Sequence, residues 1–257
     1  MTLLGLALLC GCATHPMTGR DQILALPAVQ IVHADVGFAL STGARLIAAP
    51  ASCGQDCGSD EDLAKLAGRT EAIGRELEAS AREESPELFE RIGSFRIEVN
   101  GALGVASASS PGGRIVLGSG LAALEPDDAV IAFVIAREMA HVIGRHAEEN
   151  SGAAVVTSLL GMLLPGVSVL ARFVASTVVS NALKGSWAAQ QQQEADEIAL
   201  ALLERIGHPV FSVALGLGGA AKHARLPDDD WGVRFVESSE RVALIAASQP
   251  RYVVFAE

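Results

Sequence analysis

The distribution of apolar and charged positions predicts a long helix over residues 60–84. Apolar side chains recur there at helical spacing among many charged residues, and they are Leu63, Leu66, Ile73 and Leu77. This spacing gives a helix with one buried face. Ser85 and Pro86 then predict the start of a second, short helix, with serine as the N-cap and proline at the first helical position.

The pattern changes to strand-like alternation over residues 94–121. Three apolar runs follow one another, at Phe95, Ile97 and Val99, around Val105, and at residues 115–117. The turn Ser-Pro-Gly-Gly at residues 110–113 separates the last two runs. Short alternating runs joined by turns of this composition are typical of a small antiparallel sheet.

A further helix is predicted from residue 126 onwards. Pro126, Asp127 and Asp128 place acidic side chains at its positive end. Apolar residues then recur every three to four positions, and Glu138 and His141 share their side of the helix. Polar residues at this spacing can be core residues whose hydrogen bonds are satisfied, so periodicity alone leaves their role open.

Composition favours one mostly helical domain. The chain has 257 residues, half of them apolar and only 4% aromatic, which favours helices packed closely through small side chains. With the small sheet, the predicted class is α+β. The 30 acidic residues outnumber the 19 basic ones, and the sequence has no Lys/Arg cluster with stacking aromatics, which argues against nucleic acid as a partner.

The amino-terminal residues resemble a bacterial lipoprotein signal. An apolar run leads into Leu-Cys-Gly-Cys at residues 9–12, which is similar to a lipobox whose final cysteine is lipidated. A plain signal sequence or an uncleaved apolar stub is the alternative, because no Lys or Arg precedes the run. The predicted division is a signal peptide at residues 1–11, an anchor at Cys12 with a polar linker over residues 12–22, and one domain over residues 23–257 that begins with a helix within residues 23–49.

Cys53 and Cys57 form a Cys-x-x-x-Cys pair in a loop rich in Gly, Ser and Asp. An exported chain lies in an oxidising compartment, which favours a local disulfide. Two free thiols are the alternative, and a metal site would need a second pair of ligands.

Residues 153–183 are mostly apolar, with Arg172 as their only charged residue, and are interrupted by Pro165 and Gly166. Their length approaches that of a membrane span, but the breakers and small residues favour core helices or a mobile flap. A hairpin that dips into a membrane is the alternative.

Residues 136–141, Ala-Arg-Glu-Met-Ala-His, resemble the HExxH helix of zinc peptidases with its first histidine replaced by arginine. In that motif two histidines one turn apart share a zinc ion, and the glutamate acts as general base on the bound water. Glu138 and His141 keep their places, but Arg137 puts a permanent cation at the first ligand position. The pattern indicates an inherited metal site that has lost a ligand.

An ordered set of motifs resembles peptidase family M48, which contains periplasmic lipoprotein proteases and mitochondrial Oma1-type enzymes. The set comprises the leader at residues 15–22, the segment 99–121, the degenerate HExxH, Glu-Ala-Asp at 194–196, Ile-Gly-His-Pro at 206–209, and Glu-Arg-Val at 240–242 with Phe235 in place of a histidine. The resemblance covers about residues 12–242. It implies a mostly helical, zincin-like fold with a small sheet. It also implies that an edge strand with Gly112, Gly113 and Ile115 lines the substrate cleft.

The resemblance identifies the expected zinc ligands. The third is a glutamate four residues before the motif's aspartate, and that position here is Gln192, with Asp196 in its supporting place. Of three expected ligands only His141 remains. On an unbroken helix His146 lies about 140° round from His141. Glu194 lies about 200° round from Gln192, so neither replaces a lost ligand.

The arginine itself suggests a substitute for the metal. We expect the Arg137 guanidinium to occupy the vacated position and to bond Glu138, Gln192 or Asp196. Arg137 with a neutral Gln192 carries the same summed charge as zinc with a glutamate ligand. The alternative is that Arg137 extends to the cleft mouth and leaves an empty polar pocket.

Two functions follow from the resemblance. The first is a pseudopeptidase without a cofactor, a periplasmic lipoprotein held on the outer rather than the inner membrane, which captures envelope polypeptides by strand addition. The second is an active zinc metalloendopeptidase of envelope quality control, with Glu138 as general base and substitute ligands such as His208 or His223. The loss of two ligand positions together favours the first.

Overall fold

The structure is a computed structural model that describes residues 10–15, 18–25, 60–100, 105–124, 126–150, 188–223, 226 and 230–249. The predicted disulfide of Cys53 and Cys57 and the apolar stretch 153–183 lie outside these ranges. No helix in the described part of the chain has both the length and the apolar character needed to span a membrane.

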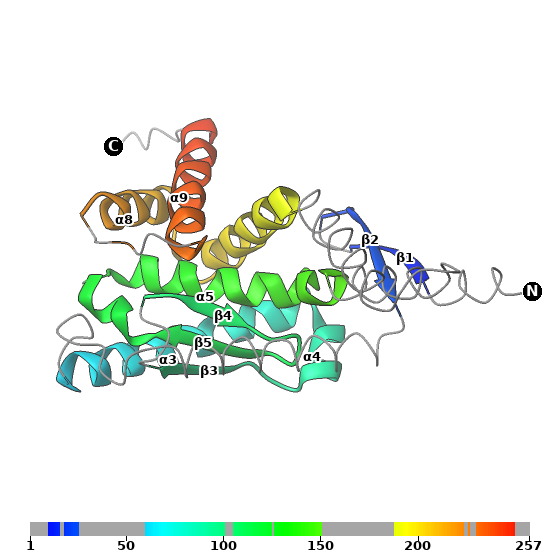
Figure 1. The fold of residues 1–257 in the computed structure, drawn as a ribbon, viewed down its shortest axis with the longest axis horizontal. Coiled ribbons are helices and arrows are strands. Elements are labelled where there is room, and N and C mark those ends of the chain that lie inside the picture. Colours follow the sequence, from blue (N-terminus) through cyan, green and yellow to red (C-terminus); the bar gives the residue numbers. More distant parts are fainter. Residues whose placement is uncertain are drawn as a thin grey trace, which may run out of the picture.

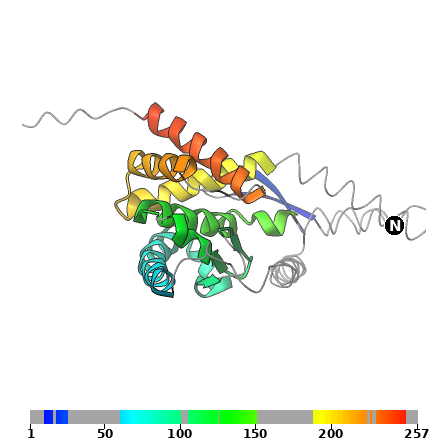
Figure 2. The same ribbon diagram turned by 60° about the vertical axis from the view of Figure 1, so that its left-hand side comes forward.

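A central helix organises the fold. This helix, α5 (Asp128–Ile143), has the three-stranded sheet on one side and the carboxyl-terminal helices on the other (Figures 1 and 2). The other helices of at least seven residues in the described ranges are α3 (Asp60–Glu84), α4 (Pro86–Ile92), an unlabelled helix over residues 188–205, α8 (Val210–His223) and α9 (Asp230–Ser248). A short 3-10 helix, η3 (Ser119–Leu124), connects the sheet to α5. The predicted mostly helical α+β class is confirmed.

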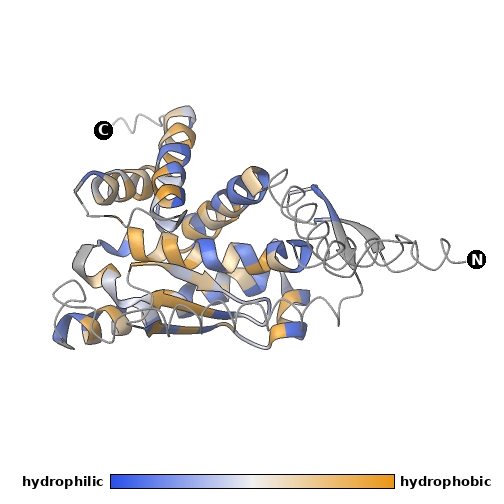
Figure 3. Cartoon of the chain, in the orientation of Figure 1, coloured by the Kyte–Doolittle hydropathy of each residue, from blue (hydrophilic) through white to orange (hydrophobic). Residues whose placement is uncertain are grey.

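Local signals set the helix ends. The Asp127 side chain caps α5 by accepting the backbone N–H of Val130 at 2.8 Å. Pro86 stands at the start of α4 as predicted, although the Ser85 side chain makes no cap hydrogen bond. In α5, 13 of 16 residues are buried, which is the burial of a helix covered on both sides. Figure 3 shows hydrophobic residues along its first half and polar ones towards its carboxyl end.

The sheet is mixed, which corrects the antiparallel prediction. Strand β5 (Arg114–Gly118) pairs antiparallel with β4 (Ser107–Ser109) and parallel with β3 (Arg96–Asn100). A turn ending at Gly113, whose φ of 81° suits glycine, joins β4 to β5 as a hairpin. Strand β3 then adds to the opposite side of β5 and runs in the same direction, so the order is β3-β5-β4.

The amino-terminal segment is a hairpin rather than a linker followed by a helix. Strand β1 (Cys10–Thr14) pairs antiparallel with β2 (Asp21–Ala25), so the first residues of the predicted helix lie in a strand. His15 and Gln22, at the two ends of the connecting turn, are each 2% exposed. The turn is therefore packed into the domain.

Candidate functional site

An interruption of the helix after α5 shapes the site. The helix ends at Ile143, Gly144 and Arg145 form a turn in which Arg145 has a φ of 55°, and residues 146–150 are again helical. The unbroken helix assumed from the sequence is therefore wrong. The turn places His146 Nδ1 2.8 Å from His141 Nδ1, with the two rings edge to face.

Arg137 lies between two side chains of helix 188–205. Its Nε donates to Asp196 Oδ1 at 2.8 Å, and its NH2 group donates to the side-chain oxygen of Gln192. Asp196, 1% exposed, also accepts from Arg241 Nε at 2.7 Å and from Ser238 Oγ at 3.0 Å. We call these five residues the arginine cluster. Two of the three expected partners of Arg137 are present, and the arginine is 11% exposed rather than extended into solvent.

The third expected partner, Glu138, is held by strand β4 instead. Its Oε1 accepts from Ser107 Oγ at 2.8 Å and its Oε2 accepts from Ser109 Oγ at 2.7 Å. Trp231 Nε1, from α9, donates to Ser107 Oγ at 3.0 Å. The ring of Trp231 stacks on Phe235, the residue that replaces the expected histidine. The carboxylate is thus fixed by hydroxyl donors on both oxygens.

A cavity of about 300 Å³ opens between β4, α5, helix 188–205 and α9. Its polar lining consists of Ser107, Ser109, Arg137, Glu138, His141, His146, Asn150, Gln191, Gln192, Trp231 and Arg234. All three predicted site residues of the HExxH remnant and Gln192 therefore meet at one cavity. His208, an expected substitute ligand, is not part of the lining.

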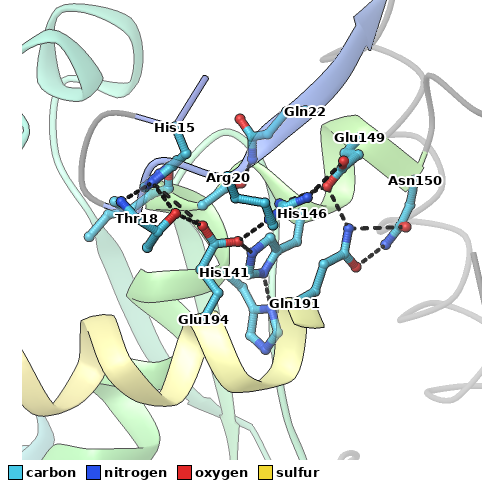
Figure 4. Close-up of polar contacts among 12 residues, drawn as sticks. His15, Thr18, Arg20, Gln22, His141, His146, Glu149, Asn150, Gln191 and Glu194 are labelled. Atoms are coloured by element: carbon cyan, nitrogen blue, oxygen red, sulfur yellow. Dashed lines mark hydrogen bonds and ion pairs between the residues drawn. The ribbon is translucent and has the colours of Figure 1, made fainter. Parts of the chain in front are cut away.

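The turn between β1 and β2 forms a second cluster beside this cavity (Figure 4). Glu194 accepts from Thr18 Oγ, from Arg20 Nε at 2.7 Å and from His146 Nε2 at 2.9 Å. Arg20 also makes a bidentate pair with Glu149, at 2.9 and 2.8 Å. We call these residues, with His15 and Gln22, the turn cluster.

His15 and Gln22 complete the turn cluster by bonding the end of α5. His15 Nε2 lies 3.2 Å from the carbonyl oxygen of Ile143, and Gln22 Nε2 donates to that of Gly144 at 2.5 Å. The last carbonyls of a helix have no partner within it, so these two side chains satisfy groups that the break leaves buried.

The ionisation states in the turn cluster, and at the adjacent His141, follow from burial and hydrogen bonds. Burial would raise the pKa of Glu194, but the hydrogen bonds from His146, Thr18 and Arg20 outweigh it and lower the pKa to about 2. Burial lowers the pKa of His146. Burial also lowers the pKa of His141, as do His146 and the positive charges of Arg137 and Arg234. At neutral pH the carboxylate is ionised and both imidazoles are neutral.

The residues at this site do not fit a zinc ion. Within the described ranges no group of three or more His, Cys, Asp or Glu side chains is placed to hold a metal. His141 keeps a suitable donor, but a guanidinium has no lone pair to give, and that of Arg137 fills the space between Gln192 and Asp196. No chemical step through zinc follows from this arrangement.

Sequence reasoning misplaced the strand at the cavity. Gly112, Gly113 and Ile115 were expected on an edge strand that lines a cleft, but β5 is central and Ile115 is fully buried. The edge strand at the cavity is β4, with Ser107 and Ser109. Their alternate spacing was the available signal, because residues two apart on a strand share a face.

The turn cluster was also missed. The side chains of the leader motif bond residues more than 120 positions away, which no local pattern predicts.

Comparison with known proteins gives two findings. The family model described as peptidase family M48 matches residues 65–214. The mitochondrial metalloendopeptidase OMA1 of Saccharomyces cerevisiae is 34% identical over 95 residues. That match covers 37% of this chain and 27% of the yeast protein, so the chain spans about a quarter of the length of this relative.

Proposed function

This chain belongs to peptidase family M48, and we propose that it is a degenerate member that binds envelope polypeptides without hydrolysing them. The observation that carries the proposal is the arginine cluster, in which Arg137 bonds Gln192 and Asp196. Zinc sites with four good ligands are worth on the order of 10–16 kcal/mol. Replacing an imidazole by a guanidinium and a carboxylate by a carboxamide removes most of that affinity.

The outer edge of β4, beside the cavity, supports the binding part of the proposal. Ala106 and Ser110 bond β5 through their backbones, because Gly118 N–H donates to Ala106 O at 2.7 Å and Ser110 N–H donates to Arg114 O at 2.8 Å. Backbone directions alternate along a strand, so Ser107 and Ser109 direct their N–H and C=O groups away from β5.

No described strand pairs with this outer edge of β4. An extended polypeptide can add there as a further strand, with its side chains over the cavity. Glu138 then has a structural role, because it bonds the hydroxyls of Ser107 and Ser109 and holds β4 against α5.

We also propose lipidation at Cys12 and a place in the cell envelope, which the lipobox-like residues 9–12 support. A fatty-acid analogue should label the protein in cells, and Cys12→Ser should abolish the label. Persistent labelling of Cys12→Ser would contradict this anchor.

An active zinc endopeptidase is the second candidate, and family membership is the observation in its favour. Metal analysis and hydrolysis of an unfolded polypeptide by the purified protein decide between the two. We expect neither bound zinc nor hydrolysis. Stoichiometric zinc, with hydrolysis that is lost in Glu138→Gln, would overturn the pseudopeptidase assignment.

Peptide binding is tested at the outer edge of β4. Ser109→Pro removes one outward N–H, and proline is tolerated on an edge strand. We expect it to weaken binding of a fluorescent extended peptide by roughly five- to tenfold, the worth of one net hydrogen bond. Ser109→Ala is the matched control, because it keeps the N–H and loses only the hydroxyl. Equal affinity of the two variants would contradict strand addition.

A further inference from the structure

Glu194, His146 and His141 form a continuous chain of hydrogen bonds that leads into the cavity. Glu194 Oε2 lies 2.9 Å from His146 Nε2, and the other nitrogen of that ring, Nδ1, lies 2.8 Å from His141 Nδ1 (Figure 4). The His141 ring lines the cavity. Local sequence patterns do not predict this contact, because the three residues come from α5, from the helical segment 146–150 and from helix 188–205.

With both imidazoles neutral, the protons in this chain have one consistent arrangement. An ionised carboxylate only accepts, so His146 Nε2 carries the proton that it shares with Glu194. A neutral imidazole has a single N–H, so His146 Nδ1 is an acceptor. His141 Nδ1 must then donate to it, which leaves the lone pair of His141 on Nε2.

We propose that Glu194, acting through His146, fixes His141 in the Nδ1–H tautomer, so that Nε2 is a permanent acceptor for an N–H of a polypeptide bound in the cavity. This inference rests on the proposed function and adds to it the group that the bound chain meets. Glu194 and His146 are positioning residues, because they act on the ligand only through His141.

The neighbouring cavity groups make an acceptor at this point useful. Both carboxylate oxygens of Glu138 already accept serine hydroxyls, and Arg137 offers donors only. Within the described residues no side chain donates to His141 Nε2. An extended polypeptide on β4 carries N–H groups that lose water when they enter the cavity, and an unmatched N–H costs about 1–3 kcal/mol.

The surrounding structure is built to hold this chain in place. Thr18 and Arg20 fix the Glu194 carboxylate from the side of the turn cluster. Gly144 gives the His146 ring its room, since a Cβ there would lie 2.5 Å from His146 Nε2. A residue with a side chain at position 144 would push the ring away from both of its partners.

Nitrogen NMR on the full chain labelled with ¹⁵N-histidine tests the tautomer directly. In the unaltered protein we expect His141 to be neutral, with a proton on Nδ1 and none on Nε2. His146→Phe and Glu194→Leu should each shift the tautomer ratio of His141 by about five- to tenfold towards Nε2–H, the worth of one hydrogen bond. A His141 protonated on Nε2 in the unaltered protein would overturn the proposal.

A conservative variant separates this role from a merely structural one. In Glu194→Gln the amide oxygen should remain opposite Arg20 and His146, because both are donors, and the tautomer should return to that of the unaltered protein. His208→Phe, at a histidine outside the cavity lining, should change nothing at His141. If Glu194→Gln behaves like Glu194→Leu, the proposed relay is wrong.

Peptide affinity links the tautomer to binding. His146→Phe should weaken binding of the fluorescent extended peptide by about five- to tenfold, and Gly144→Ala, which keeps every polar group, should weaken it in the same direction. Unchanged affinity in a variant whose His141 tautomer has shifted would overturn the acceptor role. Absence of peptide binding by the unaltered protein would instead overturn the proposed function, while the NMR result would still report on the relay.

Discussion

Helix 188–205 contributes to two polar clusters on different faces, and the two clusters have different partners. On one face Gln192 and Asp196 meet Arg137 of α5 in the arginine cluster. On the other Glu194 meets Arg20, Thr18 and His146 in the turn cluster. Both clusters join this helix to α5 or to the segment that follows it.

The difference between them lies in what each cluster needs. On the face of Gln192, Asp196 has two arginines and a serine as partners, so the contact between the helices there needs no metal. The turn cluster keeps a carboxylate whose neighbours are all donors. In both clusters a buried carboxylate surrounded by donors ties helix 188–205 to its neighbours.

The largest expected effect is the recovery of a metal at the arginine cluster. Arg137→His together with Gln192→Glu restores two histidines and a glutamate at the required spacing. We expect about one zinc per chain in the double variant, measured by metal analysis after dialysis, against none in the unaltered protein. Each single variant should bind weakly, because it supplies one ligand fewer.

A folded double variant without zinc would change the comparison. It would mean that α5 and helix 188–205 are no longer at metal-binding distance, and that the arginine cluster differs from a metal site in backbone as well as in side chains.

The second effect compares the two clusters in stability. Arg20→Ala leaves Glu149 and Glu194, only 2% and 4% exposed, without their shared cation. Removing one partner of a buried ion pair typically costs about 3–5 kcal/mol of unfolding free energy. Urea unfolding followed by circular dichroism measures the loss.

Arg137→Met is the matched variant in the arginine cluster. Asp196 keeps Arg241 and Ser238 there, so the unfolding free energy should fall by a smaller amount, about 1–3 kcal/mol. A larger loss for Arg137→Met than for Arg20→Ala would reverse the ranking of the two clusters.

The smallest effect is a decline of stability in acid that comes from the turn cluster and the adjacent His141. His141 and His146 have lowered pKa values, so below about pH 6.5 the unfolded chain binds protons that the folded protein does not, and stability falls. The contribution of Glu194 is complete above its ordinary pKa of 4.5 and is lost as the pH falls towards about 2.

Thermal unfolding between pH 7 and pH 3 measures both steps. Glu194→Gln should remove the lower step and retain the upper one. An unchanged acid limb in Glu194→Gln would assign the loss of stability to other carboxylates.

Whether the sequence predicts a feature depends on how far apart along the chain the interacting residues are. Helix α3 has the predicted bounds, and Asp127 caps α5, because both depend on residues within a turn of each other. The parallel pairing of β3 with β5 depends on which side of β5 the earlier strand joins, and local alternation carries no information about that.

The same limit applies to the site. Arg137, Glu138, His141 and Gln192 were placed together by helical spacing and a family resemblance, and they do meet at the cavity. The helical rotation of His146 away from His141 does not apply, because α5 ends at Ile143. Nothing in the spacing of the two histidines predicts that end. Arg20 and Glu194 are 174 positions apart, so only the folded chain joins them.

The shortness of β4 limits the affinity with which a polypeptide can bind there by strand addition. Its outer edge offers two residues, hence four main-chain groups, and at about 1 kcal/mol for each net hydrogen bond the backbone contribution is about 4 kcal/mol. That corresponds to a dissociation constant of about 1 mM before side chains add to it. A polypeptide held by these groups alone would dissociate soon after binding, so firm retention would require several copies of the chain acting together on one polypeptide.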